Sequence, residues 1–453
     1  MEKENPRTEA SNAVPSRTNH SSTRSISLFR TRSRTPGALE RVASRLTTRS
    51  IRDPGPPPDG GTQAWIQVFC AWLAIMNTWG FVNSFGAFQT YYSEILPQTN
   101  STISWIGSTQ ACLMFFLGGF SGRALDAGYF RPTIIVGILL HLLGIFAMSF
   151  ATKYWHFLLT QGICTGIGGG IFFVPILGLV STYFAKRRGF AIGLVTTGNS
   201  VGGIIYPTVV RQLLGKVGFG WTVRVLGFIN VAALAVVIAF MKPRLPPRKT
   251  GPLWDMAAFR DIPYLLHVLG MCFIMPPVYC VFYYVASFAR DELGMSYTES
   301  LNLVILLNGV GIPARTIPAY VGDTYIGILN TYNAFLLLTT IVLWSWLAIG
   351  SIPSWYAFAT LFGIFSAAFT GIFAATIAAY SSDISKTGTR LGMAFTAVGL
   401  SSLSGGPLSG AILKASGGYT AVICWAGACC VVSLCLSLSA RVWKHGWSLK
   451  VRC

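Results

Sequence analysis

The chain has 453 residues, of which 52% are hydrophobic and only 11% are charged. Soluble domains carry about a quarter of their residues as charged side chains, so this composition excludes an ordinary soluble protein. The formal net charge of +19 does not indicate nucleic-acid binding, because the lysines and arginines gather in a polar amino-terminal segment and in short connectors between apolar stretches. We therefore expect a multi-pass membrane protein with the lipid bilayer as its surroundings.

Residues 1–58 differ from the rest of the chain. They contain eleven Lys or Arg against five acidic residues, are rich in Ser and Thr, and end in a proline-rich run. Such a segment buries little apolar surface and is predicted to be a disordered, basic cytosolic tail. A basic, helically spaced stretch at 39–49 leaves a second interpretation open, in which part of the tail lies on anionic lipid.

From Trp65 onward, apolar stretches recur at the length of about 20 residues that a helix needs to cross a bilayer. Because lipid offers no hydrogen-bond partners to the backbone, these stretches are predicted to be helices. We expect an all-α membrane protein with about twelve spans, at 65–91, 103–122, 132–151, 155–182, 190–213, 222–241, 263–288, 299–321, 328–349, 355–380, 391–413 and 420–440.

Basic residues are concentrated in alternate connectors, which predicts that both chain ends lie in the cytosol. The connectors expected inside hold Arg123 and Arg131, then Lys186, Arg187 and Arg188, then Lys242 to Arg260, then Lys386 and Arg390. The sequon that begins at Asn100 falls in the first outside connector and is predicted to be glycosylated. The plasma membrane is the expected location.

The sequence repeats itself at a distance of about two hundred residues. Gly170-Ile171-Phe172 is echoed by Gly371-Ile372-Phe373, and Gly202-Gly203 by Gly405-Gly406. We interpret this as two six-helix halves at 59–241 and 263–440, joined by a cytosolic linker at 242–262 and followed by a tail at 441–453. Parallel six-span repeats are typical of transporters that bind their solute at mid-membrane between the halves.

Two motifs carry a family resemblance. Asp59-Gly60-Gly61, followed by Trp65, opens the first span, and Tyr183-Phe184-Ala185-Lys186-Arg187-Arg188 leads to Gly193 in the fifth. Over residues 59–440 the chain resembles the monocarboxylate porter family of the major facilitator superfamily, above all its fungal members. The resemblance implies the major facilitator fold and secondary active transport of a small organic solute by alternating access.

The signature residues also have a simpler interpretation. Arg187 and Arg188 satisfy the positive-inside pattern without any further role, and the glycines let helices approach closely. Asp126 and Arg131 belong to a degenerate copy of the superfamily's loop motif between the second and third spans. Asp126 either pairs with Arg188 as a gating latch or is a solvated loop charge.

Arg315 lies in the middle of the eighth span, where an ionisable group costs about 3 kcal/mol or more unless it faces a cavity or a partner. The resemblance implies that the arginine of this span binds an anionic substrate, and a guanidinium suits a carboxylate. The alternative is a packing arginine satisfied by carbonyls near Pro313 and Pro318. Further candidate substrate contacts, or alternatively interhelical hydrogen-bonding groups, are Asn83, Asn199, Tyr279 and Asn308.

The animal carboxylate carriers of the family that this chain resembles couple transport to protons through a lysine in the first span and an aspartate one turn before the arginine. Here Ala87 and Gly311 stand at these positions, so coupling by that pair is not expected, although protons stay a candidate coupling ion.

Other classes of protein are disfavoured. The sequence has no nucleotide-binding loop, and its ten cysteines show no disulfide or metal spacing. His141 and His267 lack a surrounding acidic or cysteine-rich motif, so we expect no enzyme, metal or cofactor. The sequence predicts a secondary transporter of a small carboxylate or related anion. The alternatives are an exporter of a fungal secondary metabolite and, more remotely, a transporter-like receptor.

Overall fold

The structure, a computed structural model, describes residues 57–184, 187–246, 254–381 and 387–447, which contain helices and no strand. Most of the predicted basic tail lies outside these residues. The helices before the predicted linker are α2 (Thr62–Asn83), α3 (Phe85–Ile95), α4 (Asn100–Asp126), α5 (Phe130–Met148), α6 (Tyr154–Phe157), the π-helix η1 (Leu158–Cys164), α7 (Thr165–Tyr183) and α8 (Arg188–Phe240). We call them the amino-terminal helices.

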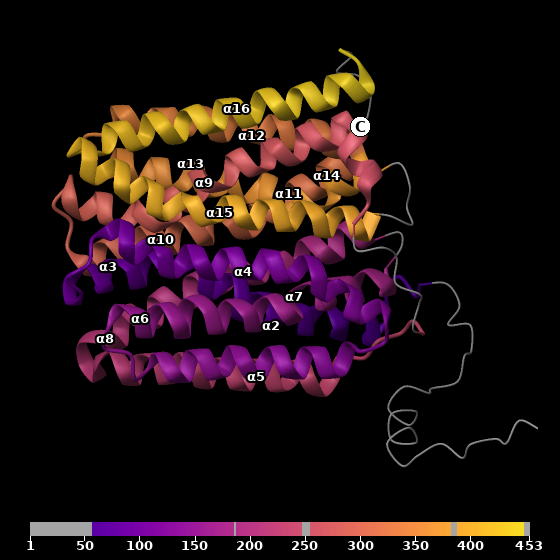
Figure 1. Cartoon of the computed structure of the whole chain (residues 1–453), viewed down its shortest axis with the longest axis horizontal. Coiled ribbons are helices and arrows are strands. Elements are labelled where there is room, and N and C mark those ends of the chain that lie inside the picture. The colour runs from indigo at the N-terminus through magenta and orange to yellow at the C-terminus, as the bar shows by residue number, and fades with distance from the viewer. Residues whose placement is uncertain (1–56, 185–186, 247–253, 382–386, 448–453) are drawn as a thin grey trace, which may run out of the picture. The chain divides into compact units, whose positions relative to one another are not determined.

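The carboxy-terminal helices follow η2 (Met256–Arg260). They are α9 (Ile262–Asp291), α10 (Tyr297–Gly309), α11 (Gly311–Val321), η3 (Gly322–Ile326), α12 (Ile328–Ser345), η4 (Trp346–Ala348), α13 (Ile352–Gly371), α14 (Phe373–Tyr380), α15 (Thr387–Ser416) and α16 (Tyr419–His445). In Figure 1 the two sets occupy separate halves of the bundle and meet where α4 packs on α15. A second contact between them joins α8 to α10 and α11.

Local sequence signals explain several helix starts. Ser296 and Glu299 form a capping box at α10, in which each side chain bonds the backbone N–H of the other residue, at 3.3 and 3.1 Å. Asp261 caps α9, whose second residue is a proline. These caps satisfy N–H groups that have no partner inside the helix.

Ten helical stretches among the described residues are long and apolar enough to cross a membrane. One of them, α8, has 53 residues and would be about 80 Å long as a straight helix, well beyond a bilayer core. Gly218 interrupts it with a φ of 73°, so α8 comprises two helices, as the predicted spans 190–213 and 222–241 require. The 30-residue α15 has the length but is rich in glycine and serine. The number twelve stays a prediction.

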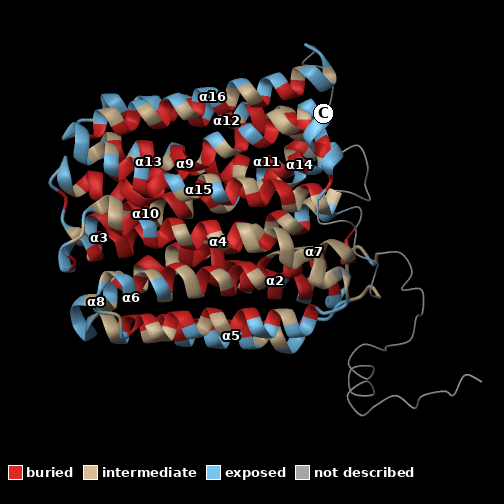
Figure 2. Ribbon diagram, in the orientation of Figure 1, coloured by how far each residue is buried: buried red, intermediate tan, exposed pale blue. Residues whose placement is uncertain are grey.

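The outermost helices expose apolar side chains. Val136, Leu139 and Leu143 on α5 are each 57–60% exposed, and Figure 2 shows exposed residues along α5 and α16 while the central helices are mostly buried. In water such a surface would drive association, whereas in lipid it is the expected outer surface. Composition and exposure therefore agree on a multi-pass membrane protein.

Close approach of helices depends on glycine pairs. A Cβ atom added to Gly80 of α2 would lie 2.5 Å from the Cα of Gly202 in α8, and one added to Gly119 of α4 would lie 2.6 Å from the carbonyl oxygen of Gly392 in α15. Neither crossing has room for a larger residue. The glycines that the sequence places in spans therefore bring backbones together, both within the amino-terminal helices and between the two sets.

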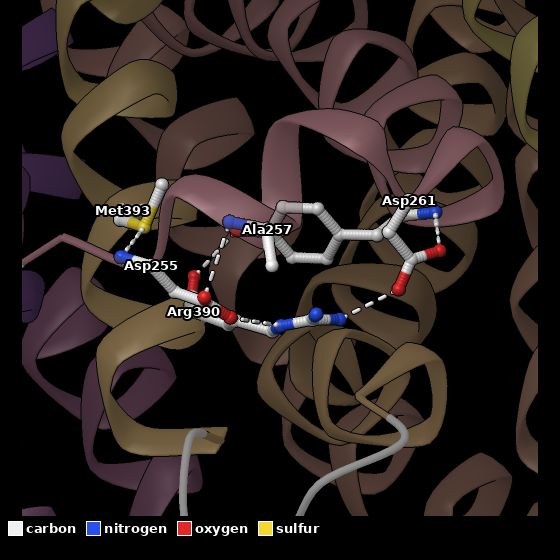
Figure 3. Close-up of polar contacts among 6 residues, drawn as sticks. Asp255, Ala257, Asp261, Arg390 and Met393 are labelled. Carbon is white, nitrogen blue, oxygen red and sulfur yellow. Dashed lines mark hydrogen bonds and ion pairs between the residues drawn. The ribbon is translucent and has the colours of Figure 1, made fainter.

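A buried ion-pair cluster closes one end of the carboxy-terminal helices (Figure 3). Arg390 at the start of α15 donates from Nε to Asp255 at 3.1 Å and from Nη1 to Asp261 at 2.6 Å. The Tyr264 hydroxyl donates to the Arg390 carbonyl oxygen at 2.7 Å. Arg390 and Asp255 are 5% and 6% exposed. The cluster thereby fixes the end of the predicted linker to α15 and α9.

We expect Arg390→Gln to destabilise the protein far more than Arg290→Gln. The first substitution removes the Arg390 charge from the buried Asp255 carboxylate and the partly exposed Asp261 carboxylate. Breaking a buried pair in this way costs about 3 to 5 kcal/mol. The second removes an ion pair of 2.9 Å with Glu94 that is partly exposed and is worth about 0 to 1 kcal/mol. Thermal unfolding in detergent, followed by tryptophan fluorescence, measures both. Equal melting temperatures for the two variants would contradict the role given to the cluster.

Candidate functional site: a central cavity

A cavity of about 150 Å³ lies between the two sets of helices. Its wall comes from α2, α4, α7 and α8 on one side and from α9, α11 and α13 to α15 on the other. Most lining residues are apolar or aromatic, and the polar ones are Asn83, Thr196, Asn199, Tyr279, Arg315, Ser366 and Thr370. A mostly apolar pocket with a few converging polar groups is the usual form of a small-molecule site.

Arg315 brings the charge to this cavity. Its side chain is 7% exposed and donates from Nε to the Ser200 hydroxyl at 3.3 Å and from Nη1 to the Thr370 hydroxyl at 3.4 Å. Both partners are neutral, and none of the ion pairs within the described residues includes Arg315. A full positive charge therefore faces the cavity without a carboxylate beside it.

Asn199 links this arginine to the amino-terminal helices. With its amide oxygen toward the guanidinium, Asn199 accepts from Arg315 Nη2 at 3.0 Å and donates to the Trp79 carbonyl oxygen at 3.1 Å. Its oxygen then also lies 3.3 Å from the amide nitrogen of Asn83. This orientation gives a partner to both ends of the Asn199 amide, whereas the opposite one turns its nitrogen toward the Arg315 donor. It also brings the Asn199 nitrogen within 2.7 Å of the Asn83 amide, so the oxygen of that amide must face Asn199. Residues from α2, α8 and α11 thus form one polar network.

Breaks in the helices shape the network. The first span is interrupted at Ser84, directly after Asn83, and the eighth is interrupted at Val310, five residues before Arg315. Glycine also matters here, because a Cβ at Gly371 would lie 3.3 Å from the Cα of Arg315. The backbone of α13 can therefore pass close to the arginine.

The structure gathers most of the predicted substrate contacts. Arg315, Asn83, Asn199 and Tyr279 all line the cavity. Asn308 does not: its amide donates to the Val304 carbonyl oxygen at 2.9 Å and fills the space over Gly203, between α10 and α8. Asn308 therefore belongs to the contact between the two sets of helices.

The two signature motifs meet each other away from the cavity. The backbone N–H of Asp59 donates to the Tyr183 carbonyl oxygen at 3.1 Å, and the Trp65 ring packs edge-on against Phe184 at 5.3 Å. Asp59 has a φ of 50°, and Gly60 and Gly61 follow it with positive φ. The D-G-G motif thus forms the turn that fastens the start of α2 to the end of α7.

The remaining signature residues lie at the ends of helices or between them. Arg131, Arg187 and Arg188 are exposed, and the Asp126 side chain lies outside the described residues, as does any latch that it forms. Gly193 faces α11, where an added Cβ would lie 3.8 Å from the Cα of Thr316. Gly193 thus adjoins the backbone of the Arg315 region.

Sequence reasoning missed the aromatic wall of the cavity and the hydroxyl partners of Arg315. Trp79, Phe115, Phe173, Phe373 and Phe395 all line the cavity. Nothing in the sequence marks them, because aromatic residues that do not line the cavity also occur throughout the spans. Ser200 follows the predicted contact Asn199 directly in the sequence, and this proximity was a signal that could have identified it. Thr370 lies in the tenth predicted span, where no predicted contact stands beside it.

Residues 67–347 match the family model of the Major Facilitator Superfamily. The chain belongs to the major facilitator superfamily. Among its members, an MFS-type transporter of Gibberella zeae is 40% identical over 91% of this chain and 94% of its own length. The fujikurins efflux protein of Gibberella fujikuroi is 32% identical over 89% and 87%, and the aspyridones efflux protein of Emericella nidulans is 30% identical over 85% and 79%. The protein is thus a major facilitator superfamily transporter.

Membership in the superfamily explains the position of the cavity. Transporters with two parallel six-helix repeats hold their solute at the interface of the repeats. The cavity found here has that position, with lining residues from both sets of helices. The predicted fold class is confirmed, and the predicted function as a transporter is confirmed with it.

Proposed function

We propose that this major facilitator superfamily transporter exports a small organic anion and binds its anionic group at Arg315. The observation that carries the proposal is the buried, cavity-lining guanidinium whose described partners are all neutral. The placement of the chain in the monocarboxylate porter branch is part of this proposal and rests on the signature motifs.

The chemistry of arginine favours an anionic cargo. A guanidinium has five N–H donors, and the three described bonds to Ser200, Thr370 and Asn199 leave two for a ligand. A carboxylate accepts two parallel bonds from such a fork. Binding an anion also offsets the cost of keeping a charge within a membrane protein.

Alternating access would move the cargo. The cavity lies between two sets of helices that touch at α4 and α15 and at α8 with α10 and α11, so rocking about these contacts would open it to either side. Its volume of about 150 Å³ is below the roughly 300 to 1,000 Å³ of pockets that hold drug-sized ligands. A larger metabolite therefore requires a wider state of the transport cycle.

Export is the direction that the relatives support, because two of them are named as efflux proteins of fungal metabolites. Deleting the gene in its own organism should raise the ratio of intracellular to secreted amount for at least one acidic metabolite. Untargeted mass spectrometry of cells and medium measures this ratio. Wild-type protein should restore it and Arg315→Gln should not. An unchanged ratio for every acidic metabolite would overturn the proposal.

We expect the transport to depend less on protons than in carriers with the lysine–aspartate pair. Ala87 and Gly311 have no ionisable side chain, so neither position offers a titratable group. Flux with and without a protonophore, at clamped voltage, tests this. Complete collapse of concentrative transport would show that another group couples the cycle to protons.

The proposed orientation places both chain ends in the cytosol and Asn100 outside, at the plasma membrane. Asn100 is the first residue of α4 and is partly exposed. We expect glycosidase treatment to shift the electrophoretic mobility of the protein and Asn100→Gln to abolish the shift. A glycan that persists in the variant would overturn this topology.

A further inference from the structure

We propose that the cavity selects organic anions whose body is a flat, conjugated ring system, through five aromatic side chains that we call the aromatic arc. The arc consists of Trp79, Phe115, Phe173, Phe373 and Phe395. This inference rests on the proposed function, because it takes Arg315 as the partner of the anionic group.

The rings of the arc form a continuous series. Trp79 lies 5.4 Å from Phe173 and 4.5 Å from Phe115, measured between ring centroids. Phe395 lies 5.7 Å from Phe115 and 5.9 Å from Phe373. The interplanar angles range from 15° for the last pair to 75° for Trp79 and Phe173. The cavity is thus bordered by both faces and edges of aromatic rings.

The arc is part of the cavity wall and is not sealed inside a helix bundle. Its five members are each 6–9% exposed, and all of them line the cavity. By contrast, the cluster of Phe288, Trp346, Trp355 and Phe358 lies among the carboxy-terminal helices and does not line it. This cluster of Phe288, Trp346, Trp355 and Phe358 contributes to packing, so a substitution in it serves as a control for substitutions in the arc.

The arc also joins the two sets of helices. Phe115 belongs to α4 and Phe395 to α15, so their contact crosses the same interface as the bond between Asn199 and Arg315. A ligand with an anionic group at Arg315 and a ring at the arc would contact the amino-terminal and the carboxy-terminal helices through its anionic group and again through its ring. Its occupancy would therefore depend on their relative position.

Aromatic walls distinguish flat from saturated rings. The negative face of one aromatic ring attracts the positive edge of another, which stabilises aromatic pairs beyond the effect of their buried area. This extra stabilisation corresponds to a dissociation constant that is about two- to tenfold lower. A merely apolar wall would show the opposite preference, because a cyclohexane ring carries more hydrogens and buries more apolar area. The sign of the preference thus identifies the kind of wall.

Benzoate and cyclohexanecarboxylate form a matched pair of probes, with the same carboxylate on a six-membered ring. We expect the purified, reconstituted transporter to bind benzoate about two- to tenfold more tightly, measured by competition and by thermal stabilisation. Phe115→Leu and Phe395→Leu should bring this ratio close to one. Phe358→Leu, outside the cavity, should leave the ratio unchanged.

The outcomes separate the inference from the proposed function. Equal binding of the two acids, or preference for cyclohexanecarboxylate, with binding that Arg315→Gln abolishes, would overturn the arc and leave the anion site intact. Absence of binding for both acids to the folded wild-type protein, while Arg315→Gln still alters the secretion of an acidic metabolite, would overturn the inference alone. An unchanged ratio of intracellular to secreted amount for every acidic metabolite would overturn the proposed function and the inference with it. A ratio that Phe358→Leu lowers as much as Phe395→Leu would show that packing alone sets it.

Discussion

Replacing Arg315 with glutamine should weaken the apparent affinity for the native anion by roughly tenfold to a hundredfold. This range corresponds to the loss of a charge-assisted hydrogen bond worth about 1.5 to 3 kcal/mol. Arg315→Lys keeps the charge but loses the planar fork, so it should also transport poorly, although better than the glutamine variant. Concentration-dependent flux in proteoliposomes provides the measurement.

Arg224→Gln is the matched control for this experiment. Arg224 lies near the start of the sixth predicted span, where its guanidinium packs over Phe150 at 4.8 Å and donates to the Ser149 hydroxyl at 3.3 Å, outside the cavity wall. Its replacement should leave the affinity unchanged. If Arg315→Gln, expressed at normal levels, moves the native substrate with unchanged affinity and rate, Arg315 is a packing residue and the argument for an anionic substrate fails.

Gly202→Val should prevent α2 and α8 from packing. An added Cβ at this position overlaps the Met76 carbonyl oxygen and lies 2.7 Å from the Cα of Gly80, and backbone atoms cannot rotate away as a side chain can. Overpacking typically costs about 1 to 3 kcal/mol, and a clash with two backbone groups of α2 should exceed that range. We expect little monodisperse protein in detergent extracts and no measurable transport.

Gly215→Ala is the matched control, because Gly215 also lies in α8 but an added Cβ meets nothing within 4 Å. This substitution should leave stability unchanged or raise it by about 0.5 to 1 kcal/mol, since alanine loses less backbone freedom in a helix. Size-exclusion profiles and melting temperatures compare the two variants. Wild-type behaviour of Gly202→Val would show that the helices can separate without loss of the fold.

Several properties could be predicted from the sequence because they depend on composition along the chain. The apolar stretches predict spans, since a backbone in lipid must bond to itself whatever its neighbours are. The motifs at Asp59 and Tyr183 indicate the superfamily to which the chain belongs. Arg315 stood out because a charge within an apolar stretch is costly wherever the other helices lie.

The neighbours of each side chain were decided only by the tertiary structure. A membrane helix is apolar toward lipid and toward its protein neighbours, so its sequence pattern barely distinguishes the two sides. Asn199 and Asn308 are both asparagines within spans, yet the first binds Arg315 and the second fills the space over Gly203. Arg390 likewise reaches Asp255, which lies 135 residues away in the chain. Such partners follow from where helices cross, and helix crossings depend on close packing between segments that are distant in sequence.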